Sequence, residues 1–315
     1  MSDLRPPFVQ AMSRGALLLD GSTGTEFMRL RLSEADMRGD RFREHPCALA
    51  SDFDILCLSR PELVTSVHES YLSAGADIIE TNTCCAIRFS QSRFGTASLT
   101  GEINREAARL AAEAAARYST AERPRYVAGA IGPVAPNADP TALTEAYTEQ
   151  ATGLIEGGAD LLLIETAFDL NCTLCAAKAC RWAMERLGRE LPVVFSFTST
   201  DPTGRIHSGH TIGEILTAVA PFRPAALGFN CGSGPATLLP AIGRLIQESP
   251  YPIVYYPSAG LPRSGELPSP EEFAGILSPL LPSLSIVGGC CGTTPSHIAA
   301  LAQLISRNTS KVTSP

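Results

Sequence analysis

Short apolar runs rich in β-branched residues recur along the whole chain, and each is followed by a longer stretch rich in Ala, Leu and Glu. The runs end in Gly, Cys or polar residues, a pattern typical of a strand, then a loop, then a helix. The helical stretches carry the usual end signals, because Pro61 opens one of them and Gly75 closes it. The expected strands are residues 16–20, 77–81, 125–131, 160–165, 192–198, 225–230, 252–257 and 284–288.

The chain has eight strand–helix units, its composition does not change along its length, and no Pro/Ser-rich linker divides it. These features predict an α/β fold with a single (β/α)8 TIM barrel at residues 14–306. A doubly wound parallel sheet is the alternative. We expect an N-terminal segment at 1–13, a polar C-terminal tail at 307–315, and an excursion at 29–60 that covers one face. Expected helices include residues 61–74, 141–156, 171–187, 235–248 and 295–305.

Composition and charge exclude several classes of protein. The 315 residues are 44% hydrophobic and 18% charged, which is unlike disordered or fibrous chains. The 25 Lys and Arg residues against 32 Asp and Glu give a net charge of −7, so nucleic acid is not expected as a partner. The chain has no apolar stretch of the ~20 residues that a membrane span needs, and two prolines interrupt its start. We therefore expect a cytoplasmic protein without membrane contact.

Three of the ten cysteines occupy positions suited to chemistry. In a barrel the active site lies at the carboxyl ends of the strands, where Cys231 ends the sixth expected strand and Cys290 and Cys291 end the eighth. Glycines on both sides leave the backbone free to turn these side chains inward. Three thiolates suit Zn²⁺ and leave its fourth position open. The alternative is that Cys231 is a small buried residue and Cys290 and Cys291 form a tight turn.

The other cysteines and a histidine pair have weaker patterns. Cys172, Cys175 and Cys180 fall on the expected helix 171–187, where we interpret them as packing residues. His207 and His210 form an H-x2-H pair that we interpret as part of a solvated loop. Cys84 and Cys85 follow the second strand, close enough to the expected site to contact substrate, but no ligand role is predicted for them.

Carboxylates end three of the expected strands: Asp20, Glu80 and Glu165. Buried acids are costly unless a cation joins them, and the chain has two lysines, Lys178 and Lys311, neither at a strand end. A substrate ammonium is then the expected cation, and a Schiff-base aldolase is excluded. The turn at 20–24 offers backbone N–H groups for a carboxylate, so an amino-acid substrate is predicted. The alternative is that Asp20 and Glu165 only cap the helices that follow.

The motifs DGSTGTEF, ETNT, GFNCG and GGCCGTTPSHI together resemble the zinc-dependent homocysteine S-methyltransferases over residues 14–306. SEADMRGDRF, AGADIIETNT, SAGLP and IVGGCCGTTP look most like the homocysteine-binding barrel of cobalamin-dependent methionine synthase. This resemblance implies zinc on Cys231, Cys290 and Cys291, and homocysteine held by Asp20 and Glu165. The further expected substrate contacts are Gly21, Ser22, Thr23, Asn82 and Asn230.

The resemblance implies that homocysteine sulfur fills the open zinc position and, as a thiolate, attacks an activated methyl group to give methionine. No D-x-H-x-x-G cobalamin motif is present, so we expect methylcobalamin or a corrinoid protein to act from outside the chain. S-methylmethionine, S-adenosylmethionine and betaine are the alternative donors. A non-catalytic homocysteine- or zinc-binding subunit is the alternative of another class. Two departures from the synthase barrel are Cys84-Cys85, where it usually has Phe, and a shorter connection at 132–147.

Overall fold

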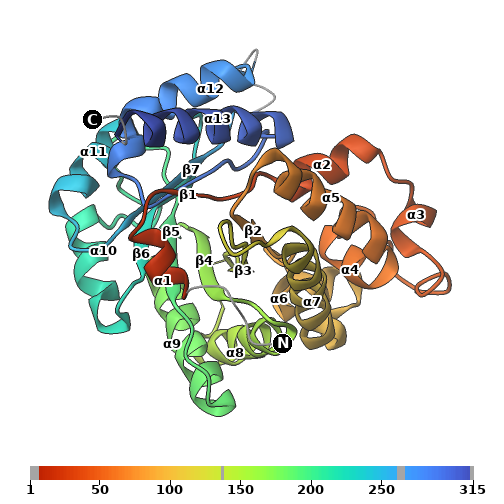
Figure 1. Ribbon diagram of the computed structural model, residues 1–315. Helices are drawn as coiled ribbons and strands as arrows, with labels where there is room; N and C mark the ends of the chain where they lie inside the picture. Colours follow the sequence, from red (N-terminus) through yellow and green to blue (C-terminus); the bar gives the residue numbers. More distant parts are fainter. Residues whose placement is uncertain (1–6, 136–137, 261–266, 313–315) are drawn as a thin grey trace.

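The computed structural model describes residues 7–135, 138–260 and 267–312. Its eight strands are all parallel and follow the order β1-β8-β7-β6-β5-β4-β3-β2, and a bridge between Leu19 and Ile78 joins the two ends of the sheet (Figure 1). The predicted (β/α)8 TIM barrel is therefore confirmed, and the doubly wound sheet is excluded. The strands are β1 (Leu17–Leu18), β2 (Ile78–Glu80), β3 (Tyr126–Ile131), β4 (Leu161–Ala167), β5 (Val193–Phe197), β6 (Ala226–Cys231), β7 (Ile253–Pro257) and β8 (Ile286–Val287).

The seam between β1 and β2 is held partly by carboxylates. Asp77 accepts a hydrogen bond from the Leu18 amide through its side chain, at 3.1 Å. Two residues past β1, the Asp20 amide donates to the Ile78 carbonyl at 2.9 Å, and the Asp20 side chain accepts from the Glu80 amide at 3.1 Å. Closure of the barrel and placement of the Asp20 carboxylate thus depend on the same contacts.

The helices surround the strands (Figure 1), and none of those described is long and apolar enough to cross a membrane. The α-helices are α1 (Phe8–Met12), α2 (Thr23–Leu30), α3 (Glu34–Arg38), α4 (Leu56–Ser59), α5 (Pro61–Ala74), α6 (Arg88–Gln91), α7 (Thr100–Tyr118), α8 (Pro140–Gly157), α9 (Leu170–Leu187), α10 (Ile212–Val219), α11 (Leu239–Glu248), α12 (Pro270–Leu277) and α13 (Pro295–Val312). Short 3-10 helices are η1 (Phe53–Ile55), η2 (Ser92–Phe94), η3 (Ala97–Leu99), η4 (Ala220–Phe222) and η5 (Ser278–Ser283).

Two helix boundaries differ from the prediction. Helix α11 begins at Leu239 and not at residue 235, because Pro240 is the proline of its first turn while 235–238 form a turn. Helix α13 runs to Val312, into the expected tail, since neither Gly nor Pro interrupts residues 296–312.

The excursion at 29–60 lies beside the barrel, next to α5 and α7 (Figure 1), and does not cover one face as expected. Its Arg41 forms an ion pair with Glu102 of α7 at 2.7 Å. It reaches the strand ends through η1, where the Phe53 carbonyl accepts from the Asn82 side chain at 2.7 Å. Other ion pairs of the segment, such as those of Arg38 with Glu34 and Arg43 with Asp40, lie within the segment itself.

Helix α1 closes the barrel at the amino ends of the strands. Phe8, Ala11 and Met12 are buried in one cluster with residues of the barrel interior, and the rings of Phe8 and Tyr126 meet edge to face at 5.5 Å. The expected N-terminal segment at 1–13 therefore packs as part of the barrel from Pro7 onward, while residues 1–6 lie outside the described part. Also outside it are Pro136 and Asn137 of the 132–147 connection, Leu261 and Pro262 of the SAGLP motif, and residues 313–315.

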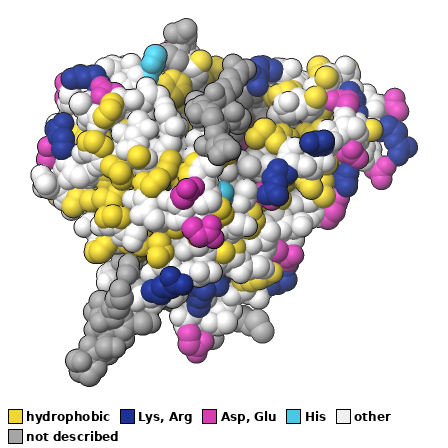
Figure 2. Space-filling view, turned by 90° about the horizontal axis from the view of Figure 1, so that it is seen from above, with side chains coloured by type: hydrophobic (Ala, Val, Ile, Leu, Met, Phe, Trp, Pro, Cys, Tyr) yellow, Lys and Arg dark blue, Asp and Glu magenta, His cyan; other side chains and the backbone are white. Residues whose placement is uncertain are grey.

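Dark blue and magenta side chains are interspersed over the face shown in Figure 2, without a continuous basic field. Many arginines are paired with acids, as Arg109 is with Glu106 and Glu113 at 2.8 and 2.6 Å.

Replacing Phe8 by Ala is expected to lower the free energy of unfolding by about 3 kcal/mol, because it leaves a cavity at the closed end of the barrel. Chemical denaturation measures this. The neighbouring Val9 is 52% exposed, so Val9→Ala serves as the control and should change stability by less than about 0.5 kcal/mol. Equal effects of the two substitutions would show that α1 does not stabilise the barrel.

Candidate metal centre and substrate site

Strand β7 holds the carboxyl ends of β6 and β8 at fixed positions on its two sides. The Ser258 amide donates to the Cys231 carbonyl at 3.0 Å, and the Cys290 amide donates to the Pro257 carbonyl at 2.9 Å. A third bond joins the Ala259 amide to the Cys291 carbonyl at 2.9 Å. As a result the sulfur atoms of the three cysteines lie within 4.8 Å of one another, with Cys231 and Cys291 4.0 Å apart.

Glycines make room for this arrangement. A Cβ atom at Gly228 would overlap the Val254 carbonyl of β7, and one at Gly289 would lie 2.5 Å from the Thr293 hydroxyl. Cys231 itself has φ of 60°, a left-handed conformation that costs a residue with a side chain about 1 kcal/mol or more. The backbone at the end of β6 therefore adopts an energetically unfavourable conformation that points the Cys231 sulfur toward the sulfurs of Cys290 and Cys291.

The three sulfurs fit a thiophilic divalent cation. Zn–S bonds of about 2.3 Å at tetrahedral angles place sulfur atoms about 3.8 Å apart, close to the distance between Cys231 and Cys291. Hydrogen bonds among the thiols lower the pKa of Cys231 and raise those of Cys290 and Cys291, because the cluster holds one thiolate readily and further ones poorly without a cation. Three protein ligands leave one tetrahedral position free.

The cysteines of α9 and the histidine pair are not part of this cluster. Within the part of the chain that the structure describes, Cys231, Cys290 and Cys291 form the one group of His, Cys, Asp and Glu with ligand spacing. Cys172, Cys175 and Cys180 are buried on α9. The His210 ring bonds to the Ser208 hydroxyl at 2.9 Å, and the His207 ring packs against Phe168 at 6.2 Å.

Beside the cysteines, three carboxyl groups converge from β1, β2 and β4. Asp20 and Glu165 are buried, and neither Oδ1 of Asp20 nor Oε1 of Glu80 has a hydrogen-bond partner among the described residues. Burial raises the pKa of each group, and repulsion from Glu165 raises those of Asp20 and Glu80 further. Burial brings the pKa of Glu165 to about 7. The arrangement is unfavourable for three negative charges, and among the described residues no Lys or Arg offsets the charge of any of the three.

The turn Gly21 to Thr23 packs directly on the turn that carries Cys290 and Cys291. The Ser22 amide donates to the Thr293 hydroxyl at 3.3 Å, and a Cβ at Gly21 would come within 2.7 Å of that hydroxyl. The Gly289 amide donates to the Asp20 carbonyl at 3.1 Å. Ser22 also caps α2, and Thr23 is the first residue of that helix. Gly21, Ser22 and Thr23 thus lie beside the turn that carries the cysteines.

Two predicted substrate contacts have a different setting. The side-chain nitrogen of Asn82 is bound to the Phe53 carbonyl, so it anchors the excursion. Asn230 is fully buried, with its amide bonded to Thr166 and Ser196. Thr166 follows Glu165 in the IET motif but had no predicted role, and Ser196 carries no motif, so only its position near the end of β5 could have identified it as a neighbour of the site.

Further polar groups border the acids and the sulfurs. The half-buried thiol of Cys84 hydrogen-bonds with Glu165, while Cys85 is exposed and has its pKa lowered to about 7 by a hydrogen bond from Cys84. The Ser258 hydroxyl donates to Cys231 sulfur at 3.4 Å. Sequence reasoning did not single out Ser258, although the PSAG turn after the seventh expected strand contains it.

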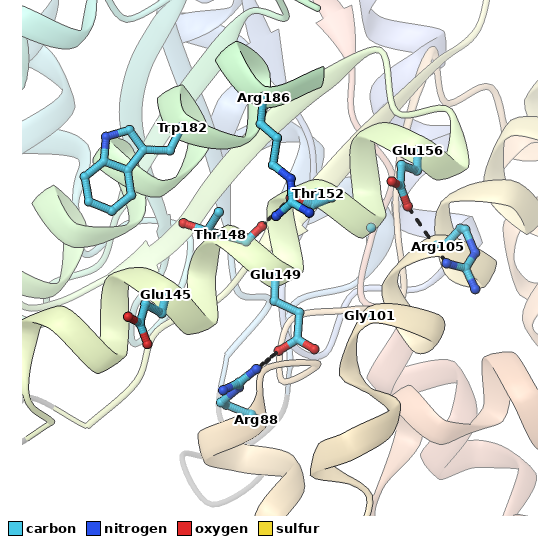
Figure 3. Close-up of a pocket in the computed structure, with 11 residues that line it drawn as sticks. Arg88, Gly101, Arg105, Glu145, Thr148, Glu149, Thr152, Glu156, Trp182 and Arg186 are labelled. Carbon is cyan, nitrogen blue, oxygen red and sulfur yellow. Dashed lines mark hydrogen bonds and ion pairs between the residues drawn. The ribbon is translucent and has the colours of Figure 1, made fainter. Parts of the chain in front are cut away.

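A separate groove lies on the outer helices, between α7, α8 and α9 (Figure 3). Its charged groups largely satisfy one another, since Arg88 pairs with Glu149 at 2.6 Å and Arg105 with Glu156 at 3.9 Å. None of its lining residues lies at a strand end, so the groove is not connected with the cysteines or the buried acids.

Comparison with known proteins agrees with this site. The sequence model for homocysteine S-methyltransferases matches residues 17–305. The oxidized form of the homocysteine methyltransferase MmuM from Escherichia coli is 25% identical, with a TM-score of 0.75 over 95% of this chain and 99% of that one. The metallated form of MmuM is also 25% identical and has a TM-score of 0.74 with the same coverage. The resemblance found in the motifs is confirmed: the chain is a methyltransferase that belongs to the homocysteine S-methyltransferase family.

Proposed function

We propose that this enzyme transfers a methyl group to the sulfur of L-homocysteine and releases methionine. The observation that carries the proposal is the pairing of three convergent thiols with three buried carboxyl groups at one rim of the barrel. Homocysteine has a thiol at one end and an ammonium at the other, so each end has a counterpart. Membership of the family favours an enzyme over a non-catalytic binding subunit.

The thiols of Cys231, Cys290 and Cys291 would hold zinc. When bound, the ion offers its free position to the substrate sulfur and keeps that sulfur deprotonated near neutral pH, where a free thiol is mostly protonated. The metallated form of MmuM supports a metal in a homologous site. All ten cysteines are free, which suits the reducing cytoplasm that we propose as the location.

The carboxyl groups of Asp20 and Glu165, with Glu80 beside them, would hold the substrate ammonium. A buried cation offsets their mutual repulsion and provides partners for the unpaired oxygens of Asp20 and Glu80. The substrate carboxylate would lie at Gly21, Ser22 and Thr23, where the first turn of α2 presents backbone N–H groups. Contacts at both the ammonium and the carboxylate of the substrate orient its sulfur for in-line attack on the methyl group. The new S–CH3 bond forms while the bond between the methyl group and the donor breaks, and the donor keeps the electron pair of that bond.

For the methyl donor we propose methylcobalamin, presented by a corrinoid protein. A small cationic donor is normally enclosed by aromatic or acidic side chains. Of the aromatic residues at these strand ends, Phe229 packs between strands and helices and Tyr256 lies inside the barrel, which leaves Phe168. The second candidate is a small donor: S-methylmethionine, S-adenosylmethionine or betaine. It is favoured by the match of this barrel to 99% of the MmuM chain, which is named a homocysteine methyltransferase.

Zinc content tests the metal site. The purified protein is expected to hold about one zinc ion per chain by plasma mass spectrometry, and Cys231→Ala, Cys290→Ala or Cys291→Ala should each lose most of the zinc and the activity, because two thiolates bind the ion far more weakly. Cys47→Ala removes a thiol of the excursion and should keep both. Full zinc occupancy in the Cys290→Ala protein would show that Cys290 is not a zinc ligand.

The substitution Glu165→Gln tests the ammonium site. We expect homocysteine to bind at least about 10-fold more weakly while zinc stays bound, because the variant loses the charge but keeps the shape. The ligand-free variant should be at least as stable as the wild type at neutral pH, since it loses one of three repelling acids. Calorimetric titration and thermal unfolding measure the two effects, with Glu145→Gln on the outer face of α8 as the control. An unchanged affinity for homocysteine would show that Glu165 has a structural role and does not bind the substrate.

The donor is tested by incubating the zinc-loaded protein and homocysteine with one donor at a time and measuring methionine by mass spectrometry. Methylcobalamin is expected to give turnover, and S-methylmethionine, S-adenosylmethionine and betaine none. The Cys291→Ala variant controls for methyl transfer without the enzyme and should give no methionine above the protein-free background. Turnover with a small donor and none with methylcobalamin would contradict the corrinoid proposal and leave the homocysteine site intact.

A further inference from the structure

Asn230 joins the cysteine cluster to strand β4. It is fully buried near the end of β6, directly before Cys231. Its Oδ1 accepts hydrogen bonds from the Thr166 amide at 2.9 Å and from the Ser196 hydroxyl at 2.8 Å. Its Nδ2 donates to the Thr166 hydroxyl at 2.8 Å and to the Cys290 sulfur at 3.7 Å.

The orientation of this amide is fixed by its surroundings. A backbone N–H can only donate, so the Thr166 amide requires the oxygen of Asn230 on its side and directs Nδ2 toward Cys290. A primary amide has two N–H groups and an oxygen with two lone pairs, and here the protein uses all four. No hydrogen-bonding capacity is left for a substrate, in contrast to the substrate contact expected from the GFNCG motif.

Strand β4 contains a bulge at the residue that Asn230 holds. Ile164 pairs with Phe195 and Ala167 with Phe197, so Glu165 and Thr166 together stand opposite Ser196. Such a bulge leaves one amide outside the ladder and redirects side chains. Thr166 has φ of 53°, a left-handed conformation that persists only where its surroundings enforce it. Asn230 does so by bonding both the amide and the hydroxyl of Thr166.

The bulge lies directly at Glu165, whose inward direction continues the alternation of β4. Along β4, Leu161 and Leu163 pack in the barrel interior, while Leu162, Ile164 and Ala167 pack toward the helices. Two residues therefore stand between the helix-facing Ile164 and Ala167, where regular alternation would allow one or three. Glu165 thus keeps its interior direction next to a strand end that Asn230 has fixed.

We propose that Asn230 is a positioning residue that sets the Cys290 sulfur and the Glu165 carboxyl group relative to each other. This inference rests on the proposed function, in which homocysteine is bound at its sulfur by the metal and at its ammonium by Glu165. One buried amide then fixes the span between the two ends of the substrate. Its N–H also limits the charge on the Cys290 thiolate, as partners of metal ligands generally do.

The test uses Asn230→Asp, which keeps the acceptor for Thr166 and Ser196 and replaces the N–H groups by an oxygen. We expect zinc affinity, measured by competition with a chromophoric chelator, to fall about 10-fold or more. The thiolate-to-cobalt absorption band of the Co²⁺-substituted protein should shift. At saturating zinc, the homocysteine dissociation constant should rise by a similar factor.

Two further variants separate the halves of the proposal. Thr166→Ala removes the hydroxyl that accepts from Asn230 and keeps the bond from the Thr166 amide, so it loosens the contact with β4 without touching Cys290. It should weaken homocysteine binding several-fold and leave zinc affinity within about 3-fold and the cobalt band in place. Ser196→Ala also removes a bond to Asn230 but leaves Thr166 and Cys290 in contact with the amide, so zinc affinity and the cobalt band should match the wild type. Circular dichroism verifies folding, and Thr166→Ala tests the proposal even where Asn230→Asp does not fold.

An Asn230→Asp protein with wild-type zinc affinity and an unchanged cobalt band would overturn the proposal, as would unchanged homocysteine binding in Thr166→Ala. Absence of zinc and cobalt binding in the wild type would instead overturn the proposed metal site. The two failures are therefore distinguishable.

Discussion

The hydrogen bonds of β7 with β6 on one side and β8 on the other are the interactions on which the site depends. They bring Cys231 and the pair Cys290 and Cys291, distant in sequence, to sulfur distances that suit one metal ion. The seam between β1 and β2 plays the same role for Asp20 and Glu80. Because the Gly289 amide also bonds to the Asp20 carbonyl, the turn before the cysteines and the first acid are joined as well. The contacts that close the barrel therefore also set the geometry of the site.

The site is locally unfavourable for folding. Cys231 and Thr166 adopt left-handed conformations, and Asp20 and Glu80 hold buried oxygens that have no hydrogen-bond partner in the described part of the chain. Such features cost about 1–3 kcal/mol each and persist where the surrounding structure enforces them. The apolar cluster inside the barrel and the larger cluster between strands and helices supply that structure. The ligand-free protein therefore carries a strain that a cationic substrate and a thiophilic metal would relieve.

Sequence reasoning identified the barrel and the three cysteines because both depend on local signals. Strand ends, glycine flanks and helix caps are visible in the order of residues, and parallel strands must end at a common rim. The bulge in β4 was not predicted, since it lies at Glu165 and Thr166, past the apolar residues 161–164 that indicated the strand. The setting of Asn230 depends on that bulge, so its bonds to Thr166 and Cys290 followed from the structure alone.

Other differences have equally local reasons. The start of α11 was predicted at Pro235, whereas the proline of its first turn is Pro240. The excursion was expected over one face because its partners on α7, such as Glu102, are distant in sequence. For the methyl donor, sequence reasoning found no motif of this kind.

The central claim is that three protein thiolates leave one metal position for the substrate sulfur. X-ray absorption at the zinc edge, recorded before and after addition of L-homocysteine, measures it directly. The account predicts three sulfur neighbours and one lighter atom in the free enzyme, and four sulfur neighbours at about 2.3 Å in the complex. A zinc environment that homocysteine leaves unchanged, at concentrations that saturate binding, would contradict the account.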